Sequence, residues 1–472
     1  MSAPIDQQTD NDAEQAANAE TWAVGAEGAQ PPAGGAARTS EWAKIREDPF
    51  GLLESIIPLG DVVLFHAGRR KSYVLIHPDH VKDALVTNHK KYRSAGTSPE
   101  MKRVLGNGLL HSDGDFHKRQ RRLANPAFHH LRINSYAEIM SGYAEKLSQS
   151  WSAGRQVDLH SEITFLALRI VSKSLFDMDI DAPEAADFRA AVHSLVPLFR
   201  MGSPVSTLLR RLQLQTTKEF DDIKAGMDRL MYQVIEERRA NPEDRGDIIS
   251  MLLLSRDDDG DGSRMNDEQV RDEATTILVA GYETTANLLT WTFGLLSEHP
   301  EIEAKLHQEV DSVLGGRLPT MEDFASLPYT KKIITEALRL YPPAWILHRR
   351  VGEEHEVGGY TLPVGASVLM FPYLVHRDPR WWDEPKRFDP DRWTDELERE
   401  RSRSFQYIPF GAGPRMCIGE AFAWMEATIV LTTLSQRWRP RVVPGHKLEA
   451  EALFNLRPKG GMPVVLEARS ER

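Results

Sequence analysis

The ten residues FGAGPRMCIG (410–419) contain the only cysteine in this chain of 472 residues, Cys417. With no second cysteine, a disulfide within the chain is excluded. The glycines and the proline before it predict a tight turn, and we expect a helix to start at or just after Cys417 and to continue through Ser435. Free N–H groups and the dipole at a helix N-terminus would lower the pKa of this thiol. Three roles remain open for it: a buried spectator, a nucleophile or a metal ligand.

The composition describes an ordinary globular protein with an excess of acid. The 58 basic and 69 acidic residues give a net charge of −11, which argues against a nucleic-acid partner. Residues 1–40 are too polar to pack, so we expect a disordered leader followed by a single domain over 41–472. The leader lacks the apolar core of a signal peptide, and no run of about 18 apolar residues offers a membrane anchor. We expect a soluble, cytoplasmic monomer.

Hydrophobic periodicity predicts a mainly α protein with a small β portion. Asn266 can cap a helix that nothing stops before Pro300, and its centre, residues 274–291, is apolar on every face, so this helix should cross the interior. The other expected elements are a hairpin over 61–78, an amphipathic helix over 228–240, an acidic surface loop over 257–264, a helix over 327–343 and short strands between 351 and 368.

The spacing around the cysteine, Phe-x-x-Gly-x-Arg-x-Cys-x-Gly, is carried by Phe410, Gly413, Arg415, Cys417 and Gly419. It resembles the haem-binding loop of the cytochromes P450, the haem-thiolate monooxygenases. The resemblance extends over nearly the whole chain after the leader. It implies the cytochrome P450 fold, haem b (iron protoporphyrin IX) as cofactor, Cys417 as the axial iron ligand and Phe410 as its shield.

Two further segments resemble the elements that brace this loop in the family. In TEALRL (335–340), a spacing of three places Glu336 and Arg339 on one helix face. In FDPDRW (388–393), the resemblance implies that Arg392 joins them in a buried structural triad. The segment departs from the family at two positions, because Asp391 and Trp393 stand where Glu and Phe are usual.

The segment AGYETT (280–285) lies in the middle of the long apolar helix. Glu283 is costly there unless it is paired or used, and the hydroxyl of Thr284 can bond a backbone carbonyl and open the helix. Taken alone, the segment also fits a helix with one satisfied acid. The resemblance implies instead that Glu283 and Thr284 are an acid–alcohol pair that handles protons.

Basic residues in three segments match the family positions that hold the two haem propionates. His117 and Arg121 are four residues apart in DGDFHKRQRRLANPAF, so both can point the same way from a helix. The resemblance adds Arg415 and Arg349, for which Arg350 is the rival.

The resemblance also implies a substrate pocket and redox partners. The resemblance implies an enzyme that activates O2 to hydroxylate or epoxidise its substrate. The pocket residues are apolar, so we expect the substrate to be a hydrophobic small molecule, such as a terpenoid or fatty acid. The pocket residues are Ala280, Ala344, Trp345, Ile346 and Phe454, with parts of 94–110 and 180–220. The sequence contains no flavin or ferredoxin domain, so electrons should come from a separate ferredoxin or flavodoxin and its NAD(P)H-dependent reductase. Its docking residues would be Lys118, Arg119, Arg122 and Arg437.

Three alternative functions differ in the use they make of these residues. A thiol-dependent hydrolase would need a histidine beside Cys417, and no motif supplies one. A haem gas sensor or electron carrier would leave Glu283 and Thr284 without a purpose. A haem-thiolate enzyme that uses peroxide needs no proton relay, so this acid and alcohol favour the O2-using enzyme.

Overall fold

The structure is a computed structural model that describes residues 48–67, 70–97, 99–129, 132, 135–198, 216–257, 260 and 262–469. The leader predicted over 1–40 lies outside these residues, as does part of the 180–220 region predicted to line the pocket.

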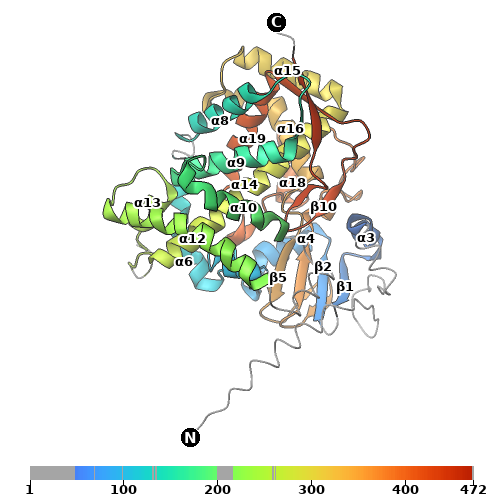
Figure 1. Cartoon of the computed structure of the whole chain (residues 1–472). Coiled ribbons are helices and arrows are strands. Elements are labelled where there is room, and N and C mark those ends of the chain that lie inside the picture. The colour runs from blue at the N-terminus through green and yellow to red at the C-terminus, as the bar shows by residue number, and fades with distance from the viewer. Residues whose placement is uncertain are drawn as a thin grey trace.

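The central element is α14 (Asp267–Glu298), which runs through the middle of the molecule in Figure 1. Its start agrees with the prediction, because the Asn266 side chain accepts from the Gln269 N–H at 2.8 Å while the Gln269 side chain accepts from the Asn266 N–H at 3.0 Å. Nearly all of its apolar centre is buried. Because α14 packs against α9 (Leu159–Phe176), α12 (Thr216–Ala240), α16 (Pro328–Leu340) and α19 (Glu420–Ser435), side chains along it can face several parts of the core.

The described residues form further helices, most of which share one main hydrophobic core with α14. They are α3 (Pro49–Ser55), α4 (Pro78–Lys82), α5 (Pro99–Leu105), α6 (Gly114–Ala124), α8 (Ala137–Ser150), α9 (Leu159–Phe176), α10 (Ala186–Leu198), α12 (Thr216–Ala240), α13 (Ile248–Leu254), α15 (Pro300–Leu314), α16 (Pro328–Leu340), α17 (Pro372–Val375), α18 (Asp395–Arg403) and α19 (Glu420–Ser435). Over the described ranges, no helix has the length and apolar character needed to cross a membrane.

The largest sheet has the order β1-β2-β8-β5-β3 and lies at the lower right of Figure 1, apart from most of the helices. Its strands are β1 (Val62–Ala67), β2 (Arg70–Leu75), β3 (Tyr92–Ser94), β5 (Leu347–Val351) and β8 (Ser367–Met370). The pairing of β1 with β2 confirms the predicted hairpin, and β2 with β8 is the parallel pair.

Three smaller sheets complete the β portion. They are β4 (Gln156–Asp158) with β12 (Pro463–Ala468) and β9 (Trp438–Val442), β6 (His355–Val357) with β7 (Tyr360–Leu362), and β10 (Ala450–Ala452) with β11 (Leu456–Pro458). The mainly α fold with a small β portion is therefore as the sequence predicts.

One predicted surface segment is partly wrong. Asp257, at the start of the acidic 257–264 stretch, keeps only 4% of its side chain exposed. Its carboxylate accepts hydrogen bonds from Arg122 and lies 3.6 Å from Arg119. An acidic side chain is usually exposed unless an opposite charge pairs with it. Here the two arginines on α6 pair with Asp257 and allow it to be buried.

Candidate active site

The segment 410–419, called here the cysteine loop, lies between α18 and α19 and is folded tightly on itself. The Cys417 N–H donates to the Phe410 carbonyl at 2.9 Å, which closes the loop. Gly413 has a φ of +70°, and a Cβ there would lie 1.9 Å from the carbonyl oxygen of Leu85. Only glycine fits at this position, so the residue in the motif is required by a close approach of two backbones.

The thiol itself differs from the sequence-based expectation. Cys417 precedes the first residue of α19, Glu420, by three positions, so its sulfur is not on the first helical turn. Its side chain keeps accessible surface, but desolvation by the surrounding protein raises its pKa to about 11. The Gly419 N–H and the charge of Arg121 oppose this shift only in part. The predicted lowering of the thiol pKa is wrong because desolvation outweighs the helix terminus.

A neutral thiol is a poor nucleophile, which argues against the hydrolase alternative. A metal ion bound to the sulfur would displace its proton whatever the pKa of the free thiol. Within the described part of the chain, no group of three or more His, Cys, Asp or Glu side chains could hold a metal ion. A single accessible sulfur can ligate the iron of haem, because the porphyrin supplies the iron with its other ligands and the protein needs to add only one.

Four basic side chains from three separate segments lie together near this loop. Burial and the positive charges of Arg415, Arg121 and Arg349 lower the pKa of His117 to about 4. Burial and the charge of Arg415 lower the pKa of Arg349 to about 10, which only Asp113 opposes. The cluster thus holds more positive than negative charge in a poorly hydrated place. This imbalance fits a ligand with two carboxylates, such as haem.

The members of this cluster are also tied to the protein. Arg121 donates to the Met416 carbonyl at 2.6 Å, beside the thiol. Arg415 donates to the Asp113 carboxylate at 2.8 Å and to the Ser112 carbonyl, so part of its guanidinium is already bonded within the protein. Arg349 is the strand residue whose charge reaches His117, whereas its neighbour Arg350 alternates to the other face of β5.

Glu283 and Thr284 face different surroundings on α14. Thr284 donates to the Ala280 carbonyl at 2.8 Å. Thr284 and Ala280 keep accessible surface, although most of the residues around them in α14 are buried. The helix continues unbroken through this point, so the predicted opening is not present. Glu283 is 3% exposed, and burial raises its pKa to about 7 although Asn455 and Arg457 partly offset the shift.

The structure brings Glu336, Arg339 and Arg392 into contact and adds a residue to the set. Glu336 accepts from Arg339 at 2.8 Å through each oxygen and from the Arg392 Nε at 3.0 Å. Its Oε2 also accepts from the indole N–H of Trp393 at 2.8 Å. In the sequence, Trp393 is a departure from the family pattern, and nothing in that pattern predicts its contact with Glu336. Its N–H, which phenylalanine lacks, was the available signal.

A hydrogen-bond path leads from this charge cluster to the cysteine loop. Arg339 donates to the His376 carbonyl at 2.8 Å, and the His376 ring nitrogen Nε2 accepts from the Ile408 N–H at 2.8 Å. Since Ile408 is two residues before Phe410, Glu336 acts on the loop through the position of Arg339.

The predicted pocket residues differ in how accessible they are. Ala280 is exposed, and Ala344, Ile346 and Phe454 are half-buried. Trp345 is 6% exposed, packs against Phe50 and Phe371, and donates its indole N–H to the Leu453 carbonyl. This burial contradicts a direct substrate contact by Trp345, because the core already covers its ring.

Ion pairs within the protein reduce the positive charge that the predicted docking residues can offer to a partner. Arg119 and Arg122 are paired with Asp257, which neutralises part of their charge. Lys118 pairs with Asp115 at 2.7 Å but stays well exposed, and Arg437 is exposed.

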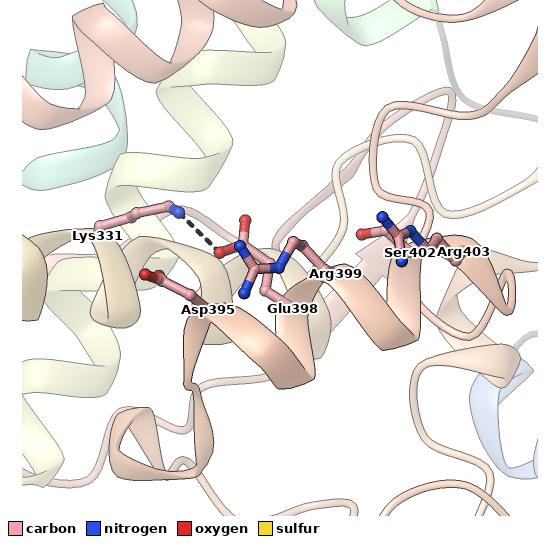
Figure 2. Close-up of a pocket in the computed structure, with 6 residues that line it drawn as sticks. All are labelled: Lys331, Asp395, Glu398, Arg399, Ser402 and Arg403. Carbon is pink, nitrogen blue, oxygen red and sulfur yellow. Dashed lines mark hydrogen bonds and ion pairs between the residues drawn. The ribbon is translucent and has the colours of Figure 1, made fainter.

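A separate hollow of about 440 Å³ lies on the surface where α18 meets α16 (Figure 2). Its lining is charged, with Lys331 and Glu398 forming an ion pair at 2.7 Å. The lining residues are Lys331, Asp395, Glu398, Arg399, Ser402 and Arg403. None of them belongs to the cysteine loop, α14 or the basic cluster, so this hollow is distinct from the candidate active site.

Comparison with known proteins agrees with this geometry. The sequence pattern of the family described as Cytochrome P450 matches residues 57–462. The chain is 40% identical to "Cyclooctatin synthase" of Streptomyces melanosporofaciens over 428 residues, covering 89% of this chain and 92% of that protein. It is 35% identical to "Pentalenene oxygenase" of Streptomyces avermitilis, covering 91% and 95%. It is also 26% identical to the chain titled "Crystal structure of cytochrome P450DA heme domain", covering 90% and 93% with a TM-score of 0.78. The chain therefore belongs to the cytochrome P450 family of haem-thiolate monooxygenases.

Proposed function

We propose that this cytochrome P450 uses O2 to hydroxylate or epoxidise a terpenoid. The observation that supports a haem-thiolate site is the accessible Cys417 sulfur, which lies beside a cluster of basic residues whose positive charge the nearby acids do not balance. Two similar proteins are named for pentalenene and for cyclooctat-9-en-7-ol, which are both largely apolar, cyclic terpenoids. The half-buried and exposed pocket residues Ala280, Ile346 and Phe454 offer such a molecule apolar surface. A fatty acid would bring a carboxylate for which these residues provide no cation.

The residues that would hold the cofactor follow from the site. Cys417 would ligate the iron, while His117, Arg121, Arg349 and Arg415 would face the two propionates. The bound haem supplies the redox chemistry that activates O2. We propose the haem b form, because Cys417 is the only cysteine in this sequence and none remains for thioether bonds to the porphyrin.

Glu283 and Thr284 would deliver protons from neighbouring positions on one helical turn. With a pKa of about 7, the Glu283 carboxyl is present both with and without its proton near neutral pH. Thr284 keeps accessible surface, so its hydroxyl can pass a proton toward the reaction centre. Since the two groups face apart, Glu283 must turn toward Thr284 for the transfer. An enzyme driven by peroxide would not need this pair.

Residues 41–472 would form one such catalytic unit, which works as a monomer. Its electrons would come from a ferredoxin or flavodoxin with an NAD(P)H-dependent reductase. Lys118 and Arg437 are the accessible members of the docking set, since Asp257 already pairs with the other two. A single cysteine suits the reducing cytoplasm, where we place the protein.

Two measurements test this function. The reduced protein with carbon monoxide should show the strongly red-shifted absorbance of a haem thiolate, and Cys417→His should lose it. An unchanged spectrum in that variant would refute the assignment of the iron ligand. A panel of cyclic terpenes and fatty acids, screened by displacement of iron-bound water and then by product analysis, tests the substrate class. Oxidation of fatty acids alone would contradict the terpenoid proposal.

A further inference from the structure

The loop that joins α5 to α6 is held against α14 by two neighbouring carboxylates. The N–H of Asn107 donates to Asp272 Oδ2 at 2.7 Å, and the N–H of Leu109 donates to Glu273 Oε2 at 2.9 Å. Both acids belong to the first half of α14, ahead of the segment that carries Thr284. Two backbone donors of one loop are therefore satisfied by a helix about 165 residues away.

The loop approaches α14 so closely that glycine is needed at two positions. A Cβ on Gly106, whose φ is +69°, would lie 2.0 Å from Asp272 Oδ1. A Cβ on Gly108 would lie 2.4 Å from Thr276 Oγ1 and 2.6 Å from the Asp272 carbonyl oxygen. The Gly-Asn-Gly sequence therefore fits the close approach of the loop to α14. Its two glycines flank Asn107, whose N–H donates to Asp272.

The two acids differ in how their charge is balanced. Arg271 is 2% exposed, donates to Asp272 at 2.9 Å and to the Val104 carbonyl at 2.6 Å, and pairs with Asp228. Glu273 is fully buried, and burial raises its pKa to about 7. The Leu109 N–H and the nearby Gln120 side chain offset this shift in part. A buried carboxyl without a cation is costly, so its place against the loop calls for an explanation.

The far end of the same loop reaches the cysteine loop. Arg415 donates to the Ser112 carbonyl and to the Asp113 carboxylate. Between these ends, Leu109 and Leu110 are half-buried and pack against the main core. The loop therefore spans from α14, one turn before Ala280, to the basic cluster, and borders the predicted pocket.

We propose that Asp272 and Glu273 are positioning residues that latch loop 106–112 over the substrate side of α14. This inference rests on the proposed function, since the loop borders the pocket assigned there. Opening the loop breaks the two N–H bonds to the acids, while the Arg415 contacts keep its far end in place. The latch then controls how fast a bulky apolar molecule enters and leaves, without taking part in the proton steps.

Two azoles that bind ferric haem iron through nitrogen test the latch in the haem-loaded full chain. Imidazole is small, whereas 4-phenylimidazole needs the space that the loop closes. Glu273→Met removes the acceptor of the Leu109 N–H, and Glu273→Gln keeps an oxygen there. Glu309→Met is the control, because Glu309 also accepts from backbone N–H groups, those of Tyr329 and Thr330 at the start of α16, whereas Glu273 accepts from the one of Leu109.

Stopped-flow absorbance measures the dissociation of each azole. We expect Glu273→Met to release 4-phenylimidazole about tenfold faster than wild type, with imidazole changed less than about twofold. Glu273→Gln should restore most of the wild-type rate. Unchanged release of 4-phenylimidazole, equal acceleration of both azoles, or the same effect in Glu309→Met would each overturn the latch.

Hydrogen exchange on the wild-type protein gives a second test that needs no variant. The amides of Asn107 and Leu109 should be protected and should exchange more slowly with 4-phenylimidazole bound, because the ligand holds the loop closed. Free exchange of both amides in both states would refute the latch. Loss of the haem-thiolate spectrum in wild type would refute the proposed function itself. A normal spectrum with no effect on azole release would refute only the latch.

Discussion

Glu283 and Thr284 are adjacent in the chain, yet their side chains experience opposite surroundings. The carboxyl is buried beside Asn455 and Arg457, whereas the hydroxyl keeps accessible surface and is held by the Ala280 carbonyl. Proton delivery by this pair can therefore be examined one residue at a time, with different observables for the acid and the alcohol.

Thr284→Ala should uncouple electron use from product formation. The variant should still consume reduced cofactor, with more peroxide and less product, because it lacks the hydroxyl that we propose to pass the proton. Thr290→Ala is the control, since Thr290 makes the same bond to the carbonyl four residues earlier, at 2.7 Å, but is fully buried. Peroxide and product are counted per electron. A wild-type ratio in Thr284→Ala would leave its hydroxyl with a structural role only.

Glu283→Gln should change how stability depends on pH. The pKa of Glu283 is raised from 4.5 to about 7 in the folded state, so the native protein binds more protons than the unfolded chain between these values. Its contribution to stability is present below pH 4.5 and is lost as the pH rises through 7. Relative to the variant, wild type should lose on the order of 3 kcal/mol of unfolding free energy across this range. Denaturant titrations of both proteins measure it, and parallel pH curves would contradict the prediction.

At the scale of elements, α16 and the segment before α18 are joined by one carboxylate. Glu336 accepts from side chains of both, and its partner Arg339 also donates to the Pro385 and Arg387 carbonyls. Glu336 and Arg339 are both fully buried. We therefore expect this network to stabilise the geometry of the cysteine loop and to take no direct part in the chemistry.

Glu336→Ala should prevent most haem incorporation. Removing the carboxylate leaves two arginines near each other without their partner, at a cost of about 3–5 kcal/mol. Haem per mole of purified protein should fall sharply, while turnover per mole of haem should be kept in the molecules that fold. Full haem content with lost turnover would point to a direct chemical role.

Trp393→Phe tests the residue that the structure added to this network. The ring is largely retained, but the indole N–H that bonds Glu336 is lost, which should cost about 1.5–3 kcal/mol because the acceptor is charged. Trp382→Phe is a matched control, since Trp382 is equally buried and donates to a neutral carbonyl, that of Val375, at 3.1 Å. Thermal unfolding of the haem-loaded proteins compares the two losses. An equal or larger loss in Trp382→Phe would show that the charge of Glu336 adds nothing.

At the scale of the whole molecule, the net charge of −11 makes the location of accessible positive charge important for an acidic redox partner. Long-range pairing has changed this distribution. Asp257 on the loop after α13 takes up part of the charge of Arg119 and Arg122, whereas Lys118 remains 59% exposed.

Lys118→Glu should weaken docking of a reduced acidic ferredoxin. The KM for the ferredoxin should rise severalfold at low salt and return toward wild type at high salt, because screening removes long-range attraction. Lys459→Glu is the control, since Lys459 is 58% exposed and paired with one acid, Glu449, as Lys118 is with Asp115. Equal effects of the two variants would mean that net charge, and not this face, governs docking.

The sequence alone was sufficient for several features that depend on nearby residues. The start of α14 follows from Asn266 and Gln269, and the contact of Glu336 with Arg339 follows from one helical turn. The motif around Cys417 likewise indicated the family, because its glycines are required by the local turn and by one close backbone approach.

Only the tertiary structure decided properties that depend on burial or on distant partners. The pKa of Cys417 is raised because surrounding protein outweighs the terminus of α19, and Trp345 is taken up by the core. Asp257 is buried because Arg122 lies opposite it, and Glu273 meets Leu109 across 164 residues of sequence. Desolvation and pairing energies depend on which atoms surround a group. For these residues, those atoms come from parts of the chain that only folding brings together.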